Sequence, residues 1–195
     1  MSTGMATLGE IEEAIRVIKE AGNEQVALLK CSSAYPAVAE DMNLKTIEHL
    51  RDTFNVPVGL SDHSHGSVAP ITAVALGATI IEKHFCLSRD IKTPDSDFSL
   101  EPDEFKEMVK NVRLAEKAVG NISYDLSKRE KKSRIFRRTI FVVENIKKGE
   151  RFTDKNTRII RPGHGLKPKH YETIIGKRAI KDIEKGTPLK WEHIG

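Results

Sequence analysis

Apolar positions in the first two thirds of the chain follow two alternating spacings. Ile11, Ala14, Ile15 and Ile18 recur at helical spacing, and Gly22 follows them as a stop signal. Similar apolar sets predict further helices near residues 44–50, 69–76 and 105–115. Short continuous apolar runs, typical of buried strands, lie at residues 26–29, 56–60 and 79–81. This alternation with short connections predicts an α/β fold in which crossover helices join parallel strands.

The last third of the chain follows a different pattern. Residues 121–136 are polar and highly charged, which indicates a linker. Thr139–Val143 is rich in strand-forming residues, and Gly and Pro interrupt the short runs that follow. Two segments repeat a Lys-Gly turn between apolar positions, Ile146–Phe152 and Ile183–Leu189. The repeat predicts a small, pseudo-symmetric β-rich domain.

Composition and charge narrow the classes of function. Of the 195 residues, 38% are hydrophobic and 31% are charged, which is enough for a packed core in one domain or two small ones. The net charge of +4 suits either nucleic acid or a small anionic substrate. Lys and Arg are mixed with Asp and Glu except in the dense basic run Lys128–Arg138, whose single aromatic residue, Phe136, does not give the interleaved aromatics of a nucleic-acid groove. We therefore expect no nucleic-acid binding.

The cysteines and the apolar runs bear on location. Cys31 and Cys86 form no CxxC pair, so the sequence indicates neither a disulfide framework nor a zinc knuckle. No apolar run is long enough to span a membrane. The first residues, Met1 to Gly4, lack the basic and apolar parts of a signal peptide. We expect a cytoplasmic protein without a membrane partner.

Polar side chains follow each of the three predicted strands, at Lys30–Ser33, Ser61–His63 and Glu82–His84. The carboxyl ends of parallel strands gather on one face, where ligands bind. Any one cluster is typical of an ordinary loop, whereas three together favour a ligand site. His63 and His84 follow neighbouring strands, so we expect both rings within reach of one metal ion. Two imidazoles leave coordination positions open, as catalysis requires.

These clusters occur in the order and spacing of a known family. The motifs are Ser2–Met5, Cys31–Pro36, Gly59–His63, Glu82–Phe85, Pro94-Asp95, Phe98–Leu100 and Arg161–Gly165. Together they resemble the sialic acid synthases, and the last resembles the antifreeze-like SAF domain of that family. The resemblance implies a TIM (β/α)8 barrel followed by a SAF domain, joined by a linker. By the count of predicted strands, only about half of the eight units is present, which is too few to close a barrel. We therefore expect an incomplete chain with three parts: the C-terminal half of the barrel at 1–120, the linker at 121–136 and the SAF domain at 137–195.

The resemblance implies that His63 and His84 are catalytic and hold a divalent metal. The ion is usually manganese in that family, with magnesium and cobalt as alternatives. The metal would polarise a sugar aldehyde, which phosphoenolpyruvate then attacks. Glu82 would assist catalysis by orienting a ligand histidine, or would instead form an ion pair near Lys83.

The same resemblance assigns the substrate contacts. Ser33 and Ser61 match positions that contact phosphoenolpyruvate, although sialic acid synthases carry Asn at position 33. Tyr35 and Asp95 match residues around the sugar acceptor. Arg161 matches an arginine that reaches the acceptor in a second subunit, which implies a domain-swapped homodimer. Simpler interpretations are strand-end hydrogen bonds for the serines, a turn for Asp95 and an ordinary surface position for Arg161.

Three features place the chain nearer the pseudaminic branch of the family than the neuraminate branch: Ser33, Phe85–Arg89 and Arg137-Arg138. The implied acceptor is a 2,4-diacetamido-2,4,6-trideoxyhexose. N-acetylneuraminate, legionaminic acid and spore-coat polysaccharide synthases are alternatives within the family. Outside it, the alternatives are another condensing barrel that joins phosphoenolpyruvate to an aldose, and a non-catalytic SAF module that binds carbohydrate.

Overall fold

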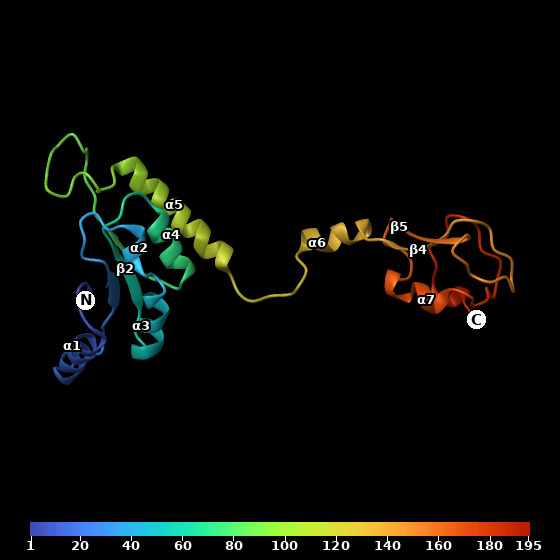
Figure 1. Cartoon of the computed structure of the whole chain (residues 1–195), viewed down its shortest axis with the longest axis horizontal. Coiled ribbons are helices and arrows are strands. Elements are labelled where there is room, and N and C mark those ends of the chain that lie inside the picture. Colours follow the sequence, from blue (N-terminus) through green and yellow to red (C-terminus); the bar gives the residue numbers. More distant parts are fainter. The chain divides into compact units, whose positions relative to one another are not determined.

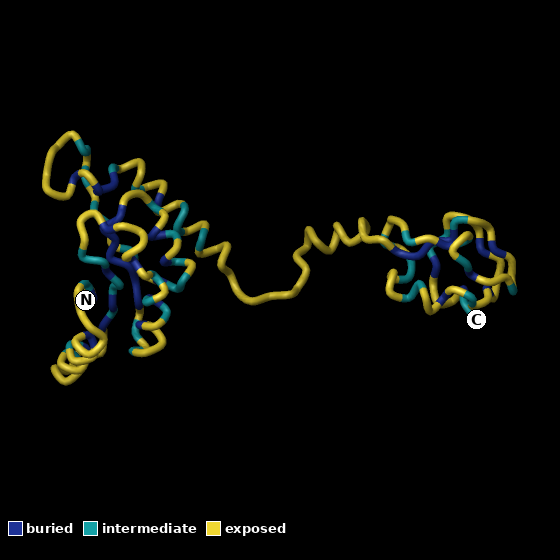
Figure 2. The backbone as a smooth tube through the Cα atoms, viewed as in Figure 1, coloured by how far each residue is buried: buried dark blue, intermediate teal, exposed yellow.

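The computed structural model describes all residues from 1 to 195, and they form two compact units, Met1–Ile122 and Ser123–Gly195. Figure 1 shows the elements of the two units, and Figure 2 shows that each unit has buried residues of its own, which form a separate core. The first contains α1 (Leu8–Glu20), β1 (Leu28–Cys31), α2 (Ala39–Met42), α3 (Thr46–Phe54), β2 (Val58–Asp62), α4 (Val68–Ala75), β3 (Ile81–Lys83) and α5 (Pro102–Val119). The second contains α6 (Lys128–Ser133), η1 (Arg134–Phe136), β4 (Thr139–Val142), β5 (Thr157–Ile160), η2 (Pro168–His170), α7 (Tyr171–Ile174) and η3 (Trp191–His193). None of the helices combines the length and the apolar character that crossing a membrane requires.

The first unit is built on a parallel sheet in the order β1-β2-β3. Ser2 forms a parallel bridge with Leu29, so the first residues line the outer edge of β1. The predicted strands are confirmed, but each ends two residues beyond its apolar run. The apolar run marks only the buried half of a strand. The polar residues after it still pair in the sheet, as Ser61 does with Glu82.

Helices cover one face of this sheet and create the first core. Leu28, Val58 and Leu60 point into that core, where Ile47 and Leu50 of α3 meet them, and all five are at most 1% exposed. Both α3 and α4 pack against β2, and α4 and α5 lie side by side (Figure 1). Burial of each large aliphatic side chain contributes roughly 1.5–3 kcal/mol. Packing against the helices therefore holds the strands, and with them the positions of their carboxyl ends.

The opposite face of the sheet carries smaller and more polar side chains. Gly59 lies there between Leu29 and Ile80, and a Cβ atom at this glycine would collide with both. Two strand edges are open, because β3 pairs only with β2 and the Ser2 segment pairs only with β1. This is the arrangement of consecutive β/α units, and the sheet does not close into a barrel within this chain.

The second unit has the pseudo-symmetry that the repeat predicts. Ile146 and Ile183 exchange both backbone hydrogen bonds, at 2.9 and 2.8 Å, which places a local two-fold axis between them. The two turn glycines, Gly149 and Gly186, share a φ of 88°. Their amides donate to equivalent carbonyl groups, those of Ala179 and Val142. The repeated turn is therefore confirmed, and glycine supplies the left-handed conformation that each copy needs.

Residues 128–136, which the sequence places in the linker, are helical and belong to the second unit as α6 and η1. The Ser127 side chain accepts a hydrogen bond from the Glu130 amide, and the Glu130 carboxylate accepts one from the Ser127 amide. Every residue of this segment is exposed, so no apolar periodicity marks the helix. The Ser-x-x-Glu capping box is the signal in the sequence that indicates it.

A loop between β3 and α5 is fastened by Arg89. Its guanidinium group donates to Glu104 at 2.5 and 2.8 Å, and its amide donates to Glu101 at 2.8 Å. The hydrogen bonds from Arg89 lower the pKa of Glu104 to about 2 from its usual 4.5. This loop carries Asp95 and Phe98 toward the end of β3. The contacts of Arg89 with Glu101 and Glu104, called the Arg89 clamp below, therefore hold part of the candidate site.

The two units are expected to unfold separately. Trp191, the single tryptophan, lies in the second unit and reports on that unit's unfolding. Phe152 is fully buried there, so Phe152→Ala should destabilise the unit by about 3–5 kcal/mol and lower the fluorescence melting temperature. Leu50→Ala in the first unit is the control. An equal shift of the tryptophan transition in the Leu50 variant would contradict independent units.

The Arg89 clamp predicts the pH range over which Glu104 contributes to the stability of the fold. A carboxyl group whose pKa is lowered by folding stabilises the fold above its unfolded value, and this contribution disappears as pH falls from 4.5 toward 2. A carboxyl-carbon NMR titration should therefore show Glu104 still ionised at about pH 3. In Arg89→Met, the pKa of the same carboxyl should rise, while the remaining hydrogen bond from the Glu101 amide still holds it below its ordinary value. Titration of Glu104 near 4.5 in the unaltered chain would rule out the clamp.

Candidate active site

Four rings from different loops meet at the carboxyl ends of the strands. Tyr35 follows β1, His63 follows β2, His84 follows β3, and Phe98 comes from the loop before α5. The ring centroids of His63 and His84 are 5.1 Å apart, and Tyr35 stacks at 4.2 Å from His63. Phe98 lies 5.0 Å from His84 and is buried. The two histidines that the sequence singles out are thus brought together at one end of the sheet.

His63 is held in one orientation by its surroundings. Its ring is buried, with Nδ1 at 3.1 Å from the Ser32 carbonyl oxygen and at 3.8 Å from the Cys31 thiol. The carbonyl group can only accept, so this contact favours a proton on Nδ1. Nε2 is then the free nitrogen that can bind a metal ion, because a second-shell partner fixes the tautomer of a ligand histidine.

His84 also has an oxygen-bearing group near its Nδ1 atom. The Asp95 carboxylate lies 3.7 Å from Nδ1 of His84, just beyond hydrogen-bond length. No third His, Cys, Asp or Glu joins the two rings in a metal-binding group. Two imidazoles with carboxylate or carbonyl partners behind them fit a divalent metal whose other positions stay open to water and substrate.

The remaining residues predicted in the first unit, Ser33, Ser61 and Glu82, have partners that the sequence does not specify. The Ser61 hydroxyl donates to Glu82 at 2.6 Å. Glu82 forms neither a hydrogen bond to a histidine ring nor an ion pair in this structure. Ser33 lies 3.7 Å from the Cys31 thiol, and the backbone of Gly4 approaches it so closely that a Cβ atom would strike the Ser33 hydroxyl.

Arg161 is the one predicted residue that the first unit does not contain. It belongs to the second unit, where its side chain is exposed and has no ion-pair partner. It precedes a turn in which the Thr139 hydroxyl donates to the Pro162 carbonyl oxygen at 2.7 Å and accepts from the Gly165 amide at 3.0 Å. The turn is thus anchored to β4, and the arginine side chain beside it is exposed.

Sequence reasoning missed two charged residues that lie between the predicted ones. Asp62 and Lys83 form an ion pair of 2.7 Å, and both side chains are fully buried. They are the last residues of β2 and β3, two positions after the apolar runs end, and they alternate with Ser61, His63, Glu82 and His84 along the chain. The sequence offered one signal for this pair. Strand alternation turns Asp62 and Lys83 toward the helix-covered face, and two opposite charges buried at neighbouring strand ends must be paired.

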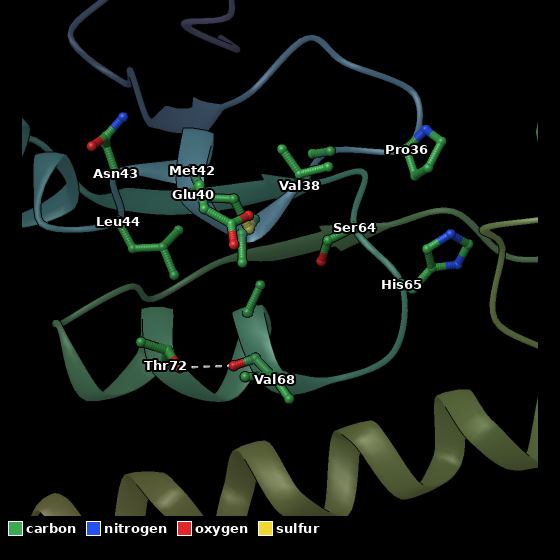
Figure 3. A pocket seen from close by; sticks show the side chains of 13 residues that line it. Pro36, Val38, Glu40, Met42, Asn43, Leu44, Ser64, His65, Val68 and Thr72 are labelled. Carbon is green, nitrogen blue, oxygen red and sulfur yellow. Dashed lines mark hydrogen bonds between the residues drawn. The ribbon is translucent and has the colours of Figure 1, made fainter.

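Two hollows lie near this end of the sheet. The cavity among the candidate residues measures about 210 Å³ and is lined by residues 61–63 and 82–84. A larger hollow of about 520 Å³ lies between α4 and the segment after Tyr35 (Figure 3). Val38, Met42, Leu44 and Val68 line it, and neither candidate ligand histidine reaches it. The two candidate ligand histidines line the smaller cavity.

Comparison with known proteins places this geometry in a family. Residues 1–124 match the NeuB family, and residues 137–195 match the SAF domain. The chain is 51% identical to a pseudaminic acid synthase of Campylobacter jejuni over 190 residues, 97% of this chain and 55% of that protein. It is 42% identical to an N,N'-diacetyllegionaminic acid synthase of the same species over 188 residues, 95% of this chain and 56% of that protein.

A solved structure shares the arrangement. The spore coat polysaccharide biosynthesis protein SpsE of Bacillus subtilis superposes with a TM-score of 0.59 at 37% identity, covering 100% of this chain and 60% of that one. The chain spans about half the length of the curated relatives it matches. Its sequence motifs, its parallel β/α units and its family matches agree, and the chain belongs to the NeuB family, with a SAF domain at its carboxyl end.

Proposed function

We propose that the whole protein containing this chain condenses phosphoenolpyruvate with an N-acetylated amino-sugar aldehyde and water. The products would be a nonulosonic acid and phosphate. The observation that carries the proposal is the convergence of His63 and His84 beside Ser61, in a chain similar to synthases of such acids. The higher identity to the pseudaminic acid synthase, 51% against 42%, favours a 2,4-diacetamido-2,4,6-trideoxyhexose as acceptor and the pseudaminic product.

His63 and His84 are the residues we propose as ligands of a divalent cation. A cation bound there supplies Lewis-acid polarisation of a carbonyl oxygen. We favour manganese, with magnesium or cobalt as alternatives, because imidazole together with water and carbonyl oxygen is compatible with each. The Ser32 carbonyl group and Asp95, both on the Nδ1 sides, would keep the two Nε2 atoms directed at the ion.

The other residues would bind and orient the substrates. Ser61 and Ser33 are proposed to contact phosphoenolpyruvate. The single hydroxyl proton of Ser61 is donated to Glu82 in this structure, so it would have to turn to the ligand to donate a hydrogen bond there. Tyr35, whose side chain is exposed above His63, and Asp95 would contact hydroxyl groups of the sugar. The methylene carbon of phosphoenolpyruvate would then bond to the aldehyde carbon. Water would add at the next carbon, and phosphate would leave with cleavage of the carbon–oxygen bond.

Charge supports a role for a second copy of the chain. The first unit carries 12 Lys and Arg against 19 Asp and Glu, a net charge of −7, and the second carries 20 against 9, a net charge of +11. Six cations of the second unit without ion-pair partners line one hollow: Lys131, Lys132, Arg134, Arg137, Arg138 and Lys167. Attraction between unlike units favours a domain-swapped homodimer, in which Arg161 of one copy binds the acceptor of the other.

Two substitutions in the complete protein separate the proposed roles. His84→Ala should abolish condensation through kcat, because Lewis-acid help acts on charge that develops in the transition state. Arg161→Ala should chiefly raise KM, by roughly 10- to 150-fold, the equivalent of about 1.5–3 kcal/mol for a hydrogen bond to a charged group. Steady-state kinetics with each substrate varied would distinguish the two. Full activity in the His84 variant would remove the metal role.

Mixing the two variants tests the swapped dimer. In a mixed dimer, one of the two sites combines an intact His84 with an intact Arg161 from the other copy. Activity should therefore return to a fraction of that of the unaltered enzyme once subunits have exchanged. An absence of rescue, with exchange confirmed by mass spectrometry of tagged copies, would exclude the role of Arg161 across subunits.

A further inference from the structure

We propose that the buried ion pair between Asp62 and Lys83 is a positioning device for the two histidines. The inference rests on the proposed function, because it concerns how the metal ligands are held. Asp62 and Lys83 are register partners on β2 and β3, with 2.7 Å between Oδ2 and Nζ. Each is followed immediately by one of the candidate ligands, so the pair ties together the two strand ends from which the rings extend.

The pair also holds the chain beyond His63. The Ser64 amide and hydroxyl donate to Asp62 Oδ1 at 2.9 and 2.7 Å. Lys83 Nζ donates in addition to the Ser64 carbonyl oxygen. The polar groups of Ser64 are therefore bound by one or the other charge. His63 lies between Asp62 and Ser64, and its own carbonyl group accepts from the Ala37 amide at 3.0 Å, so its backbone is fixed from three directions.

Both residues belong to the strand ends that line the 210 Å³ cavity, but their side chains are fully buried and point to the other face of the sheet. Alternation places Asp62 and Lys83 with Leu60 and Ile81 on the helix-covered face, while His63 and His84 lie on the opposite face. Their effect on the rings must therefore pass through the backbone. This makes them positioning residues and not groups that touch substrate.

The energetics of a buried ion pair indicate that Asp62 and Lys83 contribute to the orientation of the histidines more than to stability. In every other ion pair of the chain at least one side chain is 36% or more exposed, whereas both members of this pair are 0% exposed. Burying two charges carries a desolvation cost, and apolar replacements of similar volume are often equally stable. An apolar pair cannot hold the amide, hydroxyl and carbonyl groups of Ser64. The directional hydrogen bonds are what such a replacement would lose.

The test replaces both members together, as Asp62→Leu with Lys83→Met, in the full chain. The double variant should fold, and its thermal unfolding followed by circular dichroism should stay close to that of the unaltered chain. NMR should show that the His63 ring no longer keeps a single Nδ1-protonated tautomer and that the nuclear Overhauser contact between the two rings is lost. Affinity for Mn²⁺ should fall on the order of 10- to 100-fold, as for other partners that orient metal ligands.

Two further variants complete the design. Asp62→Asn with Lys83→Gln keeps the hydrogen-bonding shape without charge, and neutral hydrogen bonds are about half as strong. It should show a smaller loss of the same signals, and it decides the question by the same readouts if the apolar pair fails to fold. Arg16→Met removes an exposed helical pair with Glu20 and should change none of them.

The outcomes separate this inference from the proposed function. An unchanged tautomer, ring contact and Mn²⁺ affinity in the variant that folds would overturn the positioning role and leave the metal site standing. Loss of the ring contact in a chain that binds no Mn²⁺, even when unaltered, would support the positioning role and count against the metal. His63→Ala is the reference for complete loss of the site.

Discussion

The register of β2 on β3 is the constraint on which the candidate site depends. Side chains alternate between the two faces of a strand, so one pairing sets two sets of contacts at once. On the open face it brings Ser61 to Glu82 and the ring of His63 near that of His84. On the covered face it joins Asp62 to Lys83. A slip of one residue would turn the histidines into the core and the ion pair toward solvent.

One face of the sheet contributes to stability by packing against helices, and the other face carries the candidate site. Leu28, Val58 and Leu60 secure the covered face against α3 and α4, where close packing fixes the strand ends. The other face is lined by small or polar side chains such as Gly59 and Ser61, and it leaves room for ligands. Open edges on both sides of the sheet are consistent with a chain that spans about half of its relatives' length.

The sequence predicts much of this arrangement. Apolar periodicity identifies the main helices and the three parallel strands, since burial against a sheet requires that periodicity. The polar clusters after the strands identify His63 and His84 as candidates, although the sequence does not give the distance between the two rings. The partners were harder to predict: Glu82 binds Ser61, and Lys83 pairs with Asp62, because a choice among adjacent carboxylates depends on which face each one occupies. The exposed helix α6 escaped detection because it buries no side chain.

The most direct test of the account uses the seven histidines of the chain as internal reporters. Mn²⁺ broadens the NMR signals of nuclei close to its binding site, so a titration followed on the imidazole resonances maps that site. The account predicts that His63 and His84 broaden together at the lowest Mn²⁺ concentrations, before the other five, and that His63→Ala abolishes the early broadening at His84. Broadening that begins at His65 or His164, or is equal at all seven rings, would contradict it.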